Sequence, residues 1–148
     1  MLKTISKIAV AGIVGTTFMT WFMQKASKFE NKSFNIPEIL GQIFTGNKGF
    51  KSKELGYFMH YFVGLSFSAS YYLLFKSGFV KPTIRSYPII ATVNAIAGVK
   101  GWEMLNALSP HPSKTDFRKY MALLFIAHWV YALFTEESFN LLKVEPRK

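Results

Sequence analysis

Four ionisable side chains lie inside stretches of the sequence that are otherwise long and apolar, and they are the residues best suited to chemistry. They are His60, Lys100, Glu103 and His128. An ionisable side chain in a membrane-spanning helix costs roughly 2.5–3.5 kcal/mol on insertion scales, so it marks a functional candidate by default. These four residues therefore form the candidate intramembrane polar cluster of the chain.

Three kinds of chemistry would use this cluster. The imidazoles of His60 and His128 with the carboxylate of Glu103 suit a divalent metal such as iron, zinc or manganese. Alternatively, His60 and His128 could ligate a haem from its two faces. In a third reading the cluster passes protons or holds an ion or a lipid headgroup. The structural alternative is that Lys100 and Glu103 neutralise each other, while the histidines donate to nearby oxygen atoms.

The elements that must position these residues are long apolar segments separated by Lys-rich stretches. Crossing a hydrocarbon core of roughly 30 Å requires about 20 largely apolar helical residues. Four segments meet this requirement, at residues 5–24, 55–75, 87–108 and 120–135. A shorter apolar segment at residues 36–44 is predicted to be an interfacial helix in the first long loop. The predicted fold class is all-α: a single transmembrane domain over residues 1–148, built as an integral membrane four-helix bundle.

The crossing directions of these segments place the four ionisable residues at one depth. The second and fourth segments start from the same side of the membrane, and the third segment ends there. His60 and His128 lie a few residues after the starts of their segments, and Glu103 and Lys100 lie a similar number before the end of theirs. At 1.5 Å per residue, all four lie within about 5 Å of one another in depth.

Composition excludes several classes of function. The 148 residues include no cysteine, which excludes disulfides, Cys-ligated metals and thiol catalysis. The formal net charge is +10, but the cations lie beside apolar runs. They therefore indicate contact with a lipid bilayer rich in anionic headgroups rather than with nucleic acid. No Walker loop, Rossmann glycine fingerprint, GxSxG elbow or HExxH helix is present, so the motifs do not indicate an enzyme.

Short motifs in the last three predicted spans support a family resemblance. They are Met59-His-Tyr-Phe-Val-Gly64, Gly101-Trp-Glu-Met-Leu-Asn-Ala-Leu-Ser-Pro110 and Ala127-His-Trp-Val-Tyr131. In this arrangement the chain resembles the YagU-like group of uncharacterised bacterial inner-membrane proteins. The resemblance implies a multi-helix fold and a multi-pass location in the bacterial inner membrane. That group tends to carry a histidine in the third helix where this chain has Glu103, so the resemblance does not extend to a shared ligand set.

The function expected from the sequence is that of a structural or accessory membrane protein, either a homo-oligomer or part of a larger membrane complex. Small residues spaced by four on the predicted spans favour close helix packing in lipid. Two alternatives stay open. One is a metal- or haem-binding membrane protein that uses His60, Glu103 and His128, and the other is a small transporter of ions, protons or lipids.

Overall fold

The computed structural model describes residues 2–30, 34–80, 86–113, 115 and 117–144. These residues form five helices and no strand, which confirms the all-α prediction. The helices are α1 (Leu2–Glu30), α2 (Ile36–Thr45), α3 (Phe50–Lys76), α4 (Tyr87–Leu108) and α5 (Phe117–Leu141). Each of the five predicted segments lies within one of these helices. Helices α1, α3 and α5 extend beyond the predicted segments at both ends.

Local sequence explains where the shorter helices begin and end. α2 has Pro37 in its first turn, where the missing N–H costs nothing, and it ends at Gly46. The backbone of Gly46 is left-handed with φ of 71°, a conformation that glycine adopts without a Cβ clash. α4 likewise follows Ser86 with Pro88 in its first turn, and it ends at Ser109 just before Pro110.

One helix is long and apolar enough to cross a membrane by length and composition, over residues Lys3–Glu30 of α1. The core helix of a soluble protein or a signal sequence passes the same test. Among the described residues α3, α4 and α5 do not meet this criterion, so the prediction of four spans is not confirmed. Tyrosine, serine and histidine lower the mean hydropathy of α3, and charged residues lower that of α4 and α5.

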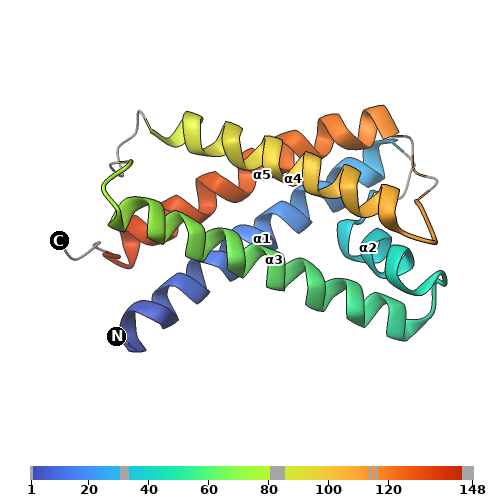
Figure 1. Ribbon diagram of the computed structural model, residues 1–148, viewed down its shortest axis with the longest axis horizontal. Helices are drawn as coiled ribbons and strands as arrows, with labels where there is room; N and C mark the ends of the chain where they lie inside the picture. Colours follow the sequence, from blue (N-terminus) through green and yellow to red (C-terminus); the bar gives the residue numbers. More distant parts are fainter. Residues whose placement is uncertain (1, 31–33, 81–85, 114, 116, 145–148) are drawn as a thin grey trace.

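The four long helices lie side by side and alternate in direction (Figure 1). α1 packs against both α3 and α5, and α5 also packs against α4. α3 and α4 make no extensive contact with each other. The helices therefore form the order α3, α1, α5, α4, and this row is open between its two outer members.

Helix α2 lies at the opposite end of the molecule from the start of α1 and packs against the first half of α3 (Figure 1). Two glycines permit this contact, because a Cβ on Gly41 would meet the backbone oxygen of Ser52 and one on Gly56 would meet that of Pro37. At the rim, Lys53 pairs with Glu38 at 2.9 Å, and this hydrogen bond raises the pKa of Lys53. The predicted interfacial helix α2 is thus held against α3 by close backbone packing and by this ion pair.

Candidate functional site

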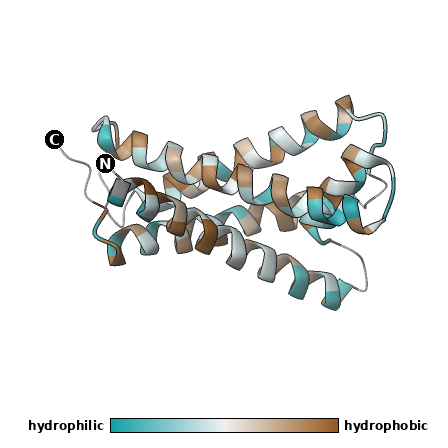
Figure 2. Ribbon diagram, turned by 90° about the horizontal axis from the view of Figure 1, so that it is seen from below, coloured by the Kyte–Doolittle hydropathy of each residue, from teal (hydrophilic) through white to brown (hydrophobic). Residues whose placement is uncertain are grey.

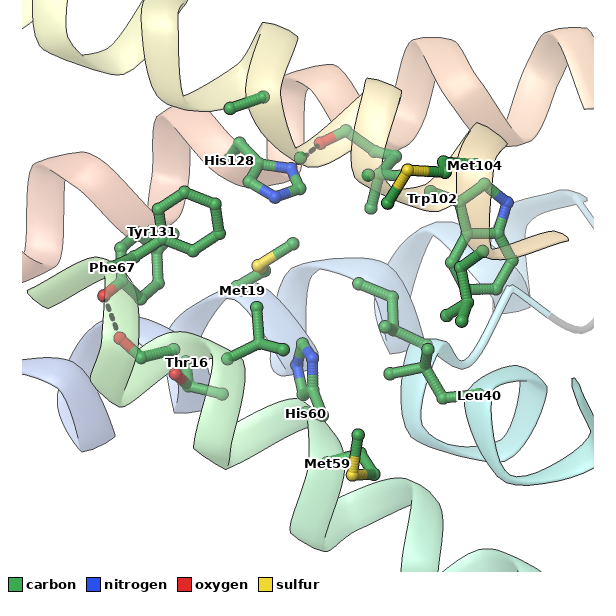
Figure 3. Close-up of a pocket in the computed structure, with 18 of the residues that line it drawn as sticks. Thr16, Met19, Leu40, Met59, His60, Phe67, Trp102, Met104, His128 and Tyr131 are labelled. Carbon is green, nitrogen blue, oxygen red and sulfur yellow. Dashed lines mark hydrogen bonds between the residues drawn. The ribbon is translucent and has the colours of Figure 1, made fainter. Parts of the chain in front are cut away.

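The open side of the helix row contains an apolar cavity of about 350 Å³. All five helices contribute to its lining, which includes Met19 of α1, Leu40 of α2 and Trp102 of α4. Figure 3 shows these side chains around the cavity. Several lining residues are also exposed, among them Phe44 of α2 at 43%, Val63 of α3 at 43% and Met104 of α4 at 63%. The cavity therefore opens to the surroundings between α3 and α4.

His60 lines the cavity from α3 and is only 6% exposed. Its Nε2 lies 3.0 Å from Oγ1 of Thr20 on α1. That hydroxyl also donates a hydrogen bond of 2.7 Å to the carbonyl oxygen of Thr16. Within the described part of the chain, Nδ1 of His60 has no hydrogen-bond partner.

His128 lines the same cavity from α5 and is likewise 6% exposed. Its Nδ1 donates to the carbonyl oxygen of Leu124 at 2.7 Å, the bond that Figure 3 draws beside the ring. Its Nε2 lies against Gly98 of α4, where an added Cβ would collide with the imidazole. No partner for Nε2 is found among the described residues. Glycine at position 98 is therefore what lets α4 approach the ring.

The two imidazoles lie on opposite walls, with Met19 drawn between them (Figure 3). Beside them, Phe67 packs edge-on against His128 at 6.2 Å between ring centroids. Tyr131 donates its hydroxyl hydrogen to the carbonyl oxygen of Gly64 at 2.5 Å, so this hydroxyl is already satisfied. Among the described residues the lining includes no carboxylate, lysine or arginine, so its unpaired polar nitrogens are those of the two histidines and of Trp102, in an otherwise apolar cavity.

The structure brings His60 and His128 together, but it keeps Lys100 and Glu103 away from them. Nζ of Lys100 bonds Oε2 of Glu103 at 2.7 Å on the outer side of α4, and neither residue lines the cavity. The predicted common depth ignores the rotation of the helix. Lys100 lies two residues after Gly98, about 200° further round α4, so it faces away from the cavity. The mutual neutralisation of the pair is the structural alternative raised above.

The predicted metal site is not assembled in the described residues. They contain no group of three or more His, Asp or Glu side chains placed to hold a metal ion. Glu103 is directed to Lys100 instead of to the histidines. The predicted haem ligands, His60 and His128, do share one cavity, but no cationic side chain of the described residues lines it. The two carboxylates of a haem would therefore have no partner there.

A buried carboxylate at the other end of α5 escaped the sequence prediction. Glu136 is 2% exposed, and both of its oxygens lack a hydrogen-bond partner among the described residues. It was missed because the fourth span was predicted to end at residue 135. Its position eight residues after His128, on the same helical stripe, was the signal available in the sequence.

Comparison with known proteins gives no relative: no family model, no curated protein and no solved structure matches the chain. The resemblance to the YagU-like group therefore stays a prediction.

Proposed function

We propose that this chain is a multi-pass membrane protein that binds a lipid-soluble ligand in the cavity between α3 and α4. In this proposal α1, α3, α4 and α5 span the bilayer. The observation that carries it is a cavity with apolar walls, a side opening and two histidines that each keep one unpaired nitrogen. A ligand that partitions into the bilayer would reach this opening directly.

The lengths of the four helices support the membrane-spanning arrangement. They contain 22 to 29 residues, so even the shortest measures about 33 Å at 1.5 Å per residue. The hydrocarbon core of a bilayer is roughly 30 Å thick. Each helix is therefore long enough to cross, although only α1 also meets the hydropathy criterion.

The outer surface of the bundle supports the same arrangement. Large apolar side chains point outwards from helices that fail the hydropathy criterion, including Phe58 and Phe62 of α3 at 66% and 56% exposure. Ile89 and Val93 of α4 are 65% and 61% exposed. Figure 2 shows hydrophobic residues along the helices, with the hydrophilic ones mainly at their ends. Soluble monomers rarely expose apolar surface on this scale, whereas a bilayer covers it.

One surface feature opposes immersion in lipid, namely the ion pair of Lys100 and Glu103 on the outside of α4. Pairing lowers its cost because the two charges cancel, and the long lysine side chain can extend towards the headgroups. Basic residues near the helix ends would be attracted to anionic lipid headgroups. We also propose that the protein lies in the bacterial inner membrane and that it assembles into a homo-oligomer or a larger complex.

Ligand binding accounts for the cavity better than a purely structural role does. Helical bundles whose only role is structural pack their interiors to high density and pair their buried polar atoms. Here the row of helices is open, and the volume of about 350 Å³ falls within the range of roughly 300–1,000 Å³ that is typical of small-molecule sites. Ion transport is less favoured, because the charged pair lies outside the cavity.

Blocking the cavity tests the proposal. Gly101 lines the cavity and an added Cβ there meets no atom within 4 Å, so Gly101→Trp is the variant chosen to occupy the cavity. Val93→Trp places the same side chain on the outer face of α4 as the matched control. We expect saturable binding of para-hexylphenol, measured by equilibrium dialysis in lipid nanodiscs, in the wild type and in Val93→Trp. Binding should be lost in Gly101→Trp; equal binding by both variants, or none by the wild type, would refute the proposal.

A further inference from the structure

We infer that the cavity selects apolar ligands that carry a hydroxyl group, because both unpaired imidazole nitrogens are hydrogen-bond acceptors. This inference rests on the proposed function and adds the chemical class of the ligand. A neutral imidazole has one nitrogen that donates and one that accepts. Which nitrogen accepts is decided by the partner of the other one.

The partners of Thr20 decide the proton position in His60. A hydroxyl carries a single hydrogen, and that of Thr20 is donated to the carbonyl oxygen of Thr16 at 2.7 Å. The 3.0 Å contact between Thr20 Oγ1 and His60 Nε2 must then use a hydrogen on Nε2. His60 Nδ1 is consequently the lone-pair nitrogen, and it has no partner among the described residues.

The partner of His128 decides its proton position more directly. Nδ1 lies 2.7 Å from the carbonyl oxygen of Leu124, and a carbonyl can only accept. The hydrogen is therefore on Nδ1, and the lone pair is on Nε2, at the surface that faces Gly98 and the cavity. Both walls thus present an acceptor.

Free donors are scarce in the lining. The hydroxyls of Thr16 and Tyr131 both donate to backbone carbonyls, of Gly12 and Gly64. The remaining polar hydrogen is on the indole nitrogen of Trp102, which Figure 3 draws on the side of the ring away from the two histidines. A ligand between the histidines consequently finds acceptors and must supply the hydrogens itself.

The ligand class follows from this pattern and from the apolar walls. A phenol, a quinol or a long-chain alcohol donates its hydroxyl hydrogen to an imidazole and places its hydrocarbon against Met19 and Leu40. An ether, a ketone or a quinone has only acceptors and would leave both imidazole lone pairs unpaired. An ionised acid would find no cation to pair with among the described lining residues. A donor ligand should therefore bind about tenfold more tightly than its methylated analogue, or better.

The test compares para-hexylphenol with para-hexylanisole, which differ by methylation of one oxygen. We expect the wild-type protein in lipid nanodiscs to bind the phenol at least about tenfold more tightly than the ether by equilibrium dialysis. His60→Leu and His128→Leu should each reduce this ratio while binding of the ether is retained. The wild-type ratio needs no variant, so a variant that fails to fold does not prevent the test.

The outcomes separate the inference from the function on which it rests. Saturable binding of both probes with equal affinity, or tighter binding of the ether, would overturn the inference and leave the proposed function standing. Saturable binding of neither probe would overturn the proposed function as well. A phenol preference that persists unchanged when both histidines are replaced would also overturn the inference.

Discussion

Replacing Gly98 with alanine tests the contact between α4 and α5 on which the cavity depends. The three atoms nearest to an added Cβ all belong to the imidazole of His128, and all three are too close for the methyl group to fit. The ring is held in place by its bond to the carbonyl oxygen of Leu124 at 2.7 Å. The methyl group must therefore displace α4, or push the ring away from Leu124.

The expected cost follows from these two contacts. Forcing an extra methyl group into a packed interior costs about 1–3 kcal/mol. Losing the histidine hydrogen bond costs about 0.5–1.5 kcal/mol more. Alanine favours the helix over glycine by about 1 kcal/mol, which offsets part of this loss. We therefore expect Gly98→Ala to lower the free energy of unfolding by about 1–3 kcal/mol. At roughly 2–4 °C per kcal/mol, Tm should fall by several degrees.

The matched control lies one turn further along the same helix. Gly101→Ala makes the same chemical change, but its Cβ meets no atom within 4 Å, so it should leave Tm unchanged or raise it. Thermal unfolding in detergent, followed by circular dichroism, gives both values. In a His128→Ala background, Gly98→Ala should cost much less than in the wild type, because the clashing ring is gone. Equal Tm values for Gly98→Ala and Gly101→Ala would refute the reasoning.

Three further predictions follow from particular side chains. Glu136→Gln should raise Tm, because it removes a carboxylate that is 2% exposed and has no partner among the described residues; a lower Tm would show that the charge is used. In a bilayer, Glu103→Ala should lower the free energy of unfolding by about 2–3 kcal/mol, because it leaves Lys100 unpaired in lipid. Adding Lys100→Ala should recover this stability. A loss of at most about 1 kcal/mol for Glu103→Ala in lipid nanodiscs would place the pair in water instead. Gly56→Ala should push α2 off α3, which hydrogen exchange would detect as faster exchange in α2 but not in α5; unchanged α2 protection would contradict it.

The helices could be predicted from the sequence, because long apolar segments bounded by lysine, proline and glycine leave few alternatives to a helix. That His60 and His128 lie at a similar level along their helices, and so reach one cavity, could also be predicted, since the rise per residue is fixed. Which face of α4 meets His128 could not be predicted. Whether Lys100 or Gly98 meets His128 depends on how α4 is rotated against α5, and that rotation is set by side-chain packing between segments distant in sequence.

The cavity itself could not be predicted for a related reason. Nothing in the apolar pattern says that α3 and α4 fail to pack against each other, because their small and apolar residues would suit a closed bundle equally well. The open row follows from α1 packing against α3 and α5 at once, through close approaches such as that of Gly64 to Thr16. The proton positions on the two histidines likewise depend on Thr20 and Leu124, which the sequence alone does not bring into contact with them.

Photo-crosslinking in native membranes tests the central claim, that a ligand enters from the bilayer between α3 and α4. The probe is an alkylphenol that carries a diazirine on its alkyl chain, and the crosslinked residues are identified by peptide mass spectrometry. We expect crosslinks at cavity-lining residues on both sides of the opening, Met59 of α3 and Met104 of α4, and we expect unlabelled para-hexylphenol to compete them away. Crosslinks confined to the outer face of α4 at Ile89 and Val93, with no competition, would contradict it.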